Sequence, residues 1–352
     1  MNPVLVHVLR GQTIESLHRG AFAVLDATGA VRLAAGDIDR PVFPRSAVKL
    51  LQALPLVASG AAQQLDLNDE QLALACGSHS GEAAHTRVAA AMLARAGLDA
   101  AALECGAHPP YAADAVRALA ALGRAPDALH NNCSGKHAGF LCLACRIAAG
   151  AGLTDLRAFA QGYVQPGHDV MRAVADAVQQ ATSYDLAGAA QGTDGCSIPT
   201  FAIPLRHLAL AYARVASGHG LDAGHAAAAS RLRRAIAQAP FMVAGSGRFD
   251  TLVMQRLGER VCCKVGAEGV YCAALPDLGL GVAIKIDDGS TRAVEVVMAA
   301  VIEALLTLDR GDADFMQQLS QVPLSNWNGL HVGDLQPAPS LREALGSVGR
   351  PA

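Results

Sequence analysis

The chain has 352 residues, of which 52% are hydrophobic and 17% are charged, so it carries enough apolar material for a sizeable core and is not a disordered chain. A net charge of −3 gives no basic field and aromatic residues make up only 4%, so we expect no nucleic-acid partner. No apolar run approaches the roughly 18–20 residues that a membrane span needs, so we expect no membrane partner.

The first 40 residues are expected to form strands. Apolar-rich runs at 21–25 and 31–35 flank a turn at 26–29, and residues 3–9 can supply another strand. From about Ser46 the apolar spacing becomes helical, and this first helix should end near Gly60. Further helices are predicted over 68–75, 82–96, 112–122, 135–149, 154–182, 203–217 and 222–238.

The last third of the chain returns to strands, predicted at 260–264, 269–274 and 279–286. A long helix should follow over about 291–308, with Ser290 or Thr291 as its N-cap. The tail from Val322 is richer in Pro, Gly and Ser, which is typical of a surface extension.

Strands at both ends of the chain can join one antiparallel sheet, covered by the C-terminal helix, with a large all-helical insertion between them. We therefore predict an α+β fold with three parts. Residues 1–45 and 258–310 form a sheet domain, residues 46–257 a helical domain, and residues 311–352 a C-terminal extension. A ligand site is expected at the seam of sheet and helices.

The cysteines and the start of the chain indicate the compartment. Nine cysteines cannot all pair internally, and they are scattered through apolar and helical segments. The first ten residues have neither the basic leader nor the apolar run of a signal peptide. We therefore expect a reduced, cytoplasmic protein.

The first chemical motif is a Ser-x-x-Lys, formed by Ser46 and Lys49 at the start of a predicted helix. Three residues are nearly one helical turn, so both side chains project from one face. A neutral lysine amine there can take the serine proton and create a nucleophile. The same pattern also arises by chance, from an N-cap serine and a solvated lysine.

Two further motifs follow in order along the chain. Ser78 and Ser80 form a Ser-x-Ser on a glycine-bounded loop, where Ser80 could instead cap the next helix. Lys264 and Gly266 form a Lys-x-Gly late in a predicted strand, where a lysine can also simply blunt a sheet edge. Ser-x-x-Lys, Ser-x-Ser and Lys-x-Gly occur in this order in penicillin-binding proteins and serine β-lactamases.

Residues 130–139 place two amides, a thiol, a hydroxyl, an amine and two imidazoles directly before an apolar helix. Residues 192–199 form a glycine-rich turn that carries Asp194 and Cys196. Cys133 and Cys196 could share a metal, a redox role or nothing, because a free cysteine is commonly a small buried hydrophobe. Two cysteines without a paired C-x-x-C do not make a zinc motif recognisable from the sequence.

The chain resembles the Rhizobium etli-type (thermolabile) L-asparaginase family, whose members have a serine β-lactamase-like fold, hydrolyse L-asparagine and tend to be homodimers. The resemblance runs in order over roughly residues 3–310. Its most specific part is the Asn-Asn-Cys-Ser-Gly-Lys-His run that begins at Asn131. The other segments that carry it are 45–49, 194–196 and 244–248.

The resemblance implies a set of functional residues. It places two catalytic Ser–Lys pairs on Ser46 with Lys49 and on Ser78 with Lys264. It implies a zinc site at Cys133, Lys136 and Cys196, and it assigns Arg45 and Asp194 to substrate or site organisation. This chain has Asp250 after Phe249, where some members have Cys.

From these residues we expect an L-asparaginase that works through an acyl-enzyme. Ser46 would attack the side-chain carboxamide, Lys49 would take its proton, and Ser78 would relay protons toward Lys264. Arg45 would bind the α-carboxylate of L-asparagine and Asp194 its α-ammonium group. The alternatives are a serine amidohydrolase that acts on glutamine, a β-lactam or a peptide, and a non-catalytic module that binds a metal or an amino acid.

Overall fold

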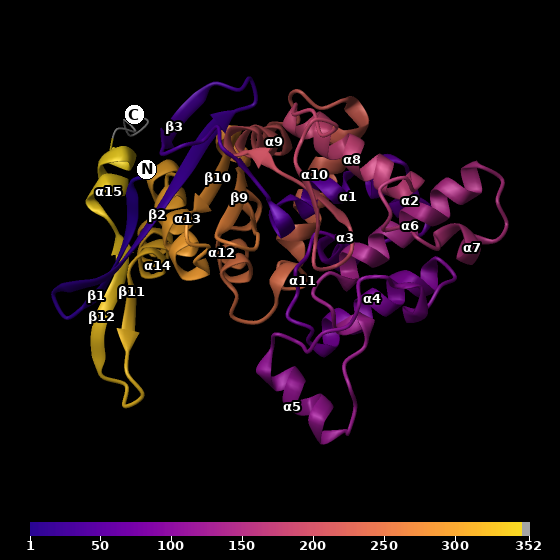
Figure 1. Ribbon diagram of the computed structural model, residues 1–352, viewed down its shortest axis with the longest axis horizontal. Helices are drawn as coiled ribbons and strands as arrows, with labels where there is room; N and C mark the ends of the chain where they lie inside the picture. The colour runs from indigo at the N-terminus through magenta and orange to yellow at the C-terminus, as the bar shows by residue number, and fades with distance from the viewer. Residues whose placement is uncertain (347–352) are drawn as a thin grey trace.

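A central antiparallel sheet organises the computed structural model, which describes residues 1–346 (Figure 1). Its strands follow the order β11-β12-β1-β2-β10-β9-β8, and β3 pairs with β2. The sequence thus correctly predicted that strands from both ends of the chain share one sheet. The strands are β1 Val4–Arg10, β2 Thr13–Asp26, β3 Val31–Ala35, β8 Cys262–Val265, β9 Val270–Leu275, β10 Leu280–Ile286, β11 Val322–Ser325 and β12 His331–Pro337.

Helices cover both faces of this sheet at its β8–β10 end. Every residue of β9 is buried, and since side chains alternate between the faces of a strand, both faces must be covered. The two helices α9 (Leu205–Ser217) and α13 (Thr291–Leu305) both contact β9 and β10. The predicted N-cap of α13 is confirmed, because the Ser290 side chain accepts a hydrogen bond from the Ala293 amide.

Gly281 allows the backbone of α9 to approach β10. A Cβ atom at this position would lie 2.0 Å from the Ala209 carbonyl oxygen and 2.2 Å from the Ala213 nitrogen. Gly281→Ala must push helix and sheet apart, so we expect the free energy of unfolding to fall by about 3 kcal/mol or more in urea denaturation. Gly167→Ala is the matched control, because its Cβ would meet nothing within 4 Å. A stable Gly281→Ala variant would contradict the packing described here.

The block between the two groups of strands is largely helical and lies beside the sheet in Figure 1. It contacts the sheet edge through η1 (Arg45–Val48), α10 and α12, all of which touch β8. Its helices, besides α9, are α1 Lys49–Ala58, α2 Ala61–Gln64, α3 Asp69–Ala75, α4 Ala83–Arg95, α5 Ala113–Ala121, α6 Ser134–Gly150, α7 Leu156–Ala160, α8 Asp169–Thr182, α10 Ala223–Gln238, α11 Phe241–Ala244 and α12 Phe249–Leu257.

Two sequence predictions for this block were wrong in detail. The single helix predicted over 154–182 is two helices, α7 and α8, because Gly162 and the Pro166-Gly167 pair interrupt it. The block is also not entirely helical, since it contributes two short antiparallel ribbons. These are β5 (Gln191–Thr193) with β6 (Pro199–Phe201), and β7 (Ile203–Pro204) with β4 (Pro41–Val42).

The tail contributes more structure than its composition indicated. β12 pairs with β1 and β11 pairs with β12, so residues after 310 extend the main sheet. The helix α14 (Arg310–Ser320) contacts β12, and α15 (Pro339–Gly346) contacts β1 and β3. The predicted division into a sheet domain, a helical domain and an extension stays a prediction. The fold class of the protein is mixed, with helices and an antiparallel sheet.

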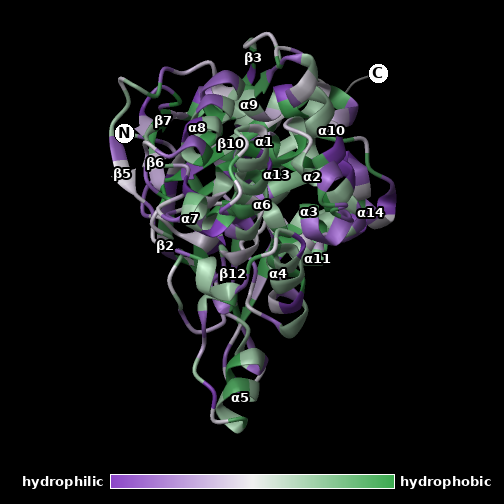
Figure 2. Ribbon diagram, turned by 90° about the vertical axis from the view of Figure 1, so that its right-hand side faces the viewer, coloured by the Kyte–Doolittle hydropathy of each residue, from purple (hydrophilic) through white to green (hydrophobic). Residues whose placement is uncertain are grey.

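The helix α5 stands apart from the rest of the molecule. It projects from the body in Figure 2, and none of its residues is buried. In other helices the apolar residues face inward: most residues of α1 and α13, for example, are buried. Among residues 1–346, no helix combines the length and the apolar character that crossing a membrane requires.

Candidate functional site

Three buried lysines mark the candidate site. The chain contains only four lysines, and Lys49, Lys136 and Lys264 are 0%, 2% and 3% exposed. Burial of a charged amine is expensive, so lysines are almost never fully buried unless they are paired or functional. This chain uses arginine for nearly all of its other cations and places most of its lysines in one interior region.

Lys49 begins α1, directly after the short 3-10 turn Arg45–Val48 that carries the half-buried Ser46. Its Nζ donates to the Gly77 carbonyl oxygen at 2.6 Å and to the Asn132 carbonyl oxygen at 3.5 Å. The amine therefore joins the loop that carries Ser78 to the loop that begins the Asn-Asn-Cys motif.

Ser78 is buried between two other segments. Its backbone N–H donates to the Val243 carbonyl oxygen at 2.7 Å, and the next amide, that of His79, donates to the Asn132 carbonyl oxygen at 3.1 Å. Its Oγ atom has no hydrogen-bond partner within residues 1–346. A buried hydroxyl with no partner usually has a role that a static set of contacts does not reveal.

Lys264 reaches the same region from the sheet. It lies in β8, whose end contacts η1. Gly266 permits this contact, because a Cβ atom there would lie 2.6 Å from the Pro44 carbonyl oxygen and 3.2 Å from the Ala47 Cβ. The glycine of the Lys-x-Gly motif thus brings Lys264 next to the turn that carries Ser46.

The charge of Lys49 acts on Lys264, and both charges act on the Cys76 thiol. Burial lowers the pKa of Lys264 to about 8, Asp250 opposes this change, and Lys49 adds to it. Burial raises the pKa of the Cys76 thiol, while the charges of Lys264 and Lys49 oppose that rise. Both amines therefore lie close to the loop that leads to Ser78, and Lys264 can become neutral in the mildly alkaline range.

Arg45 and Asp194 form an ion pair, with Arg45 Nε 2.6 Å from Asp194 Oδ1. Burial raises the pKa of Asp194, but the charges of Lys136 and Arg45 outweigh it, and the net pKa is lowered. Arg45 has a positive φ of 51°, which costs free energy in a non-glycine residue and is typical of functional sites. A cavity of about 330 Å³ has Arg45 in its wall, together with Arg40, Glu268 and Lys285.

Cys133, Lys136 and Cys196 also come together. Lys136 Nζ donates to Cys196 Sγ at 3.0 Å. A hydrogen bond from Cys196 lowers the pKa of Cys133 well below its usual value, against the effect of burial, and Lys136 and Lys49 lower it further. Burial lowers the pKa of Lys136, but Cys133 and Cys196 outweigh this effect and raise it. The lowered pKa of Cys133 and the raised pKa of Lys136 therefore favour a thiolate beside an ammonium group.

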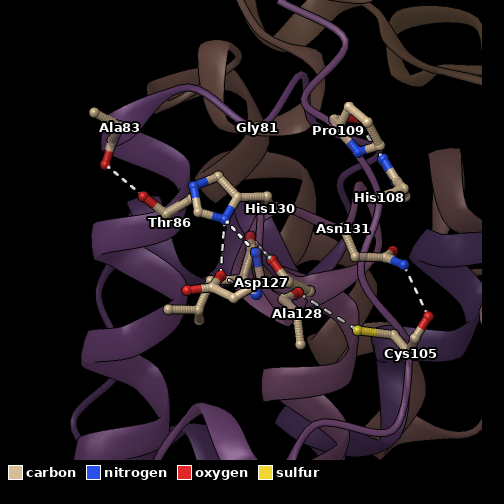
Figure 3. Close-up of polar contacts among 12 residues, drawn as sticks. Gly81, Ala83, Thr86, Cys105, His108, Pro109, Asp127, Ala128, His130 and Asn131 are labelled. Atoms are coloured by element: carbon tan, nitrogen blue, oxygen red, sulfur yellow. Dashed lines mark hydrogen bonds and ion pairs between the residues drawn. The ribbon is translucent and has the colours of Figure 1, made fainter. Parts of the chain in front are cut away.

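The remaining polar groups of the Asn-Asn-Cys motif act as scaffold (Figure 3). Asn131 Nδ2 donates to the Cys105 carbonyl oxygen at 2.8 Å, and its Oδ1 accepts from the Cys133 amide. His130 Nδ1 lies 2.8 Å from Asp127 Oδ1, and Cys105 Sγ donates to the Ala128 carbonyl oxygen. The density of polar residues here thus fixes the backbone that presents Cys133 and the Asn132 carbonyl.

Ser80 does not cap the next helix. Its Oγ donates to the Ala244 carbonyl oxygen at 2.8 Å, and Glu82 occupies the N-cap of α4. Glu82 also accepts hydrogen bonds from the amide and the hydroxyl of Ser246. The Ser-x-Ser loop is therefore tied to residues 244–246, which explains why that segment belongs with the other motifs.

Two buried groups near the site were named from the sequence, but neither was given a catalytic role. His137 is fully buried, with Nδ1 2.6 Å from the Tyr163 hydroxyl oxygen, and Asp250 is 1% exposed. The small number of lysines could have pointed to the buried amines of the site from the sequence alone.

All nine cysteines lie in the described part of the chain as free thiols. Within residues 1–346, no cluster of three His, Cys, Asp or Glu side chains could hold a metal.

Comparison with known structures returns crystal structures of Mglu. In its native form Mglu is 15% identical, with a TM-score of 0.34, over 78% of this chain and 61% of the Mglu chain. In its tris and glutamate form it is 16% identical, with the same TM-score, over 84% of this chain and 61% of the other. This chain thus spans less than two thirds of the length of Mglu. A search of curated proteins gave no match.

The family comparison covers nearly the whole chain. The model of the L-asparaginase II family matches residues 6–337, which include the strands at both ends of the sheet and every candidate site residue named above. This protein belongs to the L-asparaginase II family.

Proposed function

We propose that this protein is an L-asparaginase, an amidohydrolase that converts L-asparagine to L-aspartate and ammonia. The observation that carries the proposal is the burial of Lys49 and Lys264 near the Ser78 hydroxyl, which has no hydrogen-bond partner among residues 1–346, in a chain that has only four lysines. Serine and lysine together are sufficient for nucleophilic acyl transfer. Family membership adds the amide as the bond to be cleaved.

In the proposed mechanism Ser46 attacks the carbon of the side-chain carboxamide. The Ser46 proton passes to Lys49, Lys49 helps to deliver a proton to the carboxamide nitrogen, the C–N bond breaks, and ammonia leaves. Water then attacks the resulting ester and releases L-aspartate. Ser78 relays protons from Lys49 toward Lys264, which must be neutral to accept one and whose pKa of about 8 allows this.

Arg45 and Asp194 suit the two charges of an amino acid. Arg45 pairs with Asp194 through Nε. The terminal nitrogens of the Arg45 guanidinium group would bind the α-carboxylate. The Asp194 carboxylate would hold the α-ammonium group. The cavity lined by Arg45 would then admit the substrate.

We also propose zinc at Cys133, Lys136 and Cys196. The fit rests on two sulfur atoms and one amine that already converge, with Cys133 held as the thiolate that a metal needs. Lys136 would have to lose its proton to act as a ligand. A bound zinc would add positive charge and help to orient the substrate. Metal analysis of the purified protein and of a Cys133→Ser variant tests this site.

The proposed fold family is that of the serine β-lactamases, supported by the order of the Ser46, Ser78 and Lys264 motifs and by the sheet with its helical block. We further propose a homodimer, which sedimentation analysis tests.

The decisive experiment is ammonia release from L-asparagine, run beside L-glutamine and the coloured β-lactam nitrocefin. We expect release from L-asparagine. Release from L-glutamine alone, or a colour change with nitrocefin, would instead support a serine hydrolase acting on another amide. Thermal stabilisation by aspartate and by zinc, with no ammonia from any amide, would identify a non-catalytic binding module.

A further inference from the structure

Two charged side chains form hydrogen bonds with the same residue at the end of β8. Lys264 Nζ donates to the carbonyl oxygen of its neighbour Val265 at 2.8 Å. Asp250, in the first turn of α12, accepts from the backbone N–H of the same Val265 through Oδ1, at 2.9 Å. One residue of the main chain therefore connects the candidate catalytic amine to a carboxylate on a helix.

The position of Asp250 is costly for the fold. The residue is 1% exposed, and its Oδ2 atom has no hydrogen-bond partner within residues 1–346. A second carboxyl, that of Glu295 on α13, lies close enough that burial and the Asp250 charge raise its pKa to about 7. A buried, incompletely bonded carboxylate beside another acid is destabilising. The charge of Asp250 must therefore serve some other group, and Lys264 is the buried cation next to it.

We propose that Asp250 is a positioning residue of the amidohydrolase, one that fixes the end of β8 through Val265 and supplies the negative charge that sets when the Lys264 amine gives up its proton. This inference rests on the function proposed above. It also assigns a role to a position that the Ser, Lys and Cys motifs do not include.

The charged groups around Lys264 determine whether loss of the Asp250 charge raises or lowers the pKa of Lys264. Burial, Lys49 of α1 and Arg248 at the start of α12 all lower the pKa of Lys264, whereas Asp250 raises it, as does Cys133 before α6. Removal of the Asp250 charge must therefore lower the pKa of Lys264 further. Lys264 would then be neutral in a larger fraction of molecules at neutral pH.

Two variants separate the charge of Asp250 from its hydrogen bond. Asp250→Asn removes the charge and keeps an oxygen that can accept from the Val265 amide, whereas Asp250→Ala removes both. Isotope-labelled lysine, observed by NMR at its ε-carbon, follows the titration directly, because the chain has only four lysines. Lys264→Arg identifies the Lys264 signal.

We expect the Lys264 titration to move to lower pH by about one pH unit in Asp250→Asn. The low-pH limb of kcat/KM for L-asparagine should move with it. Asp250→Ala should shift the titration equally and also lower kcat, because the end of β8 loses its anchor. Asp114→Asn, a change on the exposed α5, should alter neither.

Superimposed Lys264 titrations in Asp250→Asn and the unmodified protein would overturn the proposal, and so would a shift to higher pH. The NMR titration needs no substrate. If the unmodified protein releases no ammonia from L-asparagine, the proposed function fails, while the electrostatic role of Asp250 is still decided by the titration.

Discussion

Ser46→Ala should abolish nearly all ammonia release from L-asparagine, with kcat lowered by at least about 10³-fold. The variant has no oxygen to attack the carboxamide carbon, and no acyl-enzyme can form. The substitution removes one half-buried hydroxyl at the turn before α1, so the fold should persist. Steady-state ammonia assays measure the loss, and mass spectrometry of acid-quenched reactions should detect the acyl-enzyme only in the unmodified protein.

Ser78→Ala is the matched variant. Under the proposed relay it should also lower kcat, yet an acyl adduct should still form on Ser46, only more slowly. Near-normal turnover by Ser46→Ala, combined with complete loss in Ser78→Ala, would make Ser78 the nucleophile. The buried Ser78 hydroxyl, which has no partner within the described residues, is the group that would then take over this role.

Lys264→Met should lower kcat/KM by about 10²-fold to 10⁴-fold and remove its pH dependence near 8. In the unmodified protein Lys264 has a lowered pKa of about 8, so its neutral form grows as the pH rises through that value. If the neutral amine is the proton acceptor, kcat/KM rises over the same range. A variant without the amine has no such limb. A pH–rate profile in buffers of constant ionic strength measures both effects.

Lys264→Arg keeps a positive charge and cannot titrate in this range. It should be as inactive as Lys264→Met. High activity in Lys264→Arg would mean that the charge, and not the neutral amine, is what the reaction uses. Arg117→Met, on the exposed α5, serves as a control for removal of a cation and should retain the activity and pH profile of the unmodified protein.

The local patterns of the sequence predicted much of the fold. The strands at 21–25 and 31–35 and the helix after Ser290 were found because alternation, turn residues and caps are short-range signals. The joining of the two ends in one sheet followed from the need of each amphipathic strand for a partner. The helical period predicted over 154–182 hid the break at Pro166, because the flanking residues keep the same period.

The structure of the tail could not be predicted in the same way. β11 has only four residues, and Pro323 in β11 and Gly333 in β12 both argue against strands by their own propensities. They form because β1 offers an edge on which β12 can pair. A strand that depends on a partner more than 300 residues away along the chain leaves little local signal.

The candidate site was predicted as a set of residues but not as a set of contacts. The order of motifs predicted Lys49, Ser78 and Lys264 as site residues. In the fold, Gly266 packs against the turn before Lys49, and Lys49 Nζ donates to the Gly77 carbonyl oxygen beside Ser78. The direct pairing of Arg45 with Asp194 was not foreseen, because residues 149 positions apart carry no pattern that links them. Asp250 was noted as a departure from the family pattern, but its hydrogen bond to the Val265 amide was not predicted, because a single backbone contact leaves no pattern in the sequence.

The scarcity of lysine has a practical consequence for handling the protein. Reagents that couple to primary amines find Lys49, Lys136 and Lys264 shielded, which leaves the half-buried Lys285 as the most accessible of the four lysines. Because Lys285 lines the same cavity as Arg45, a bulky label on Lys285 would block the passage proposed for the substrate.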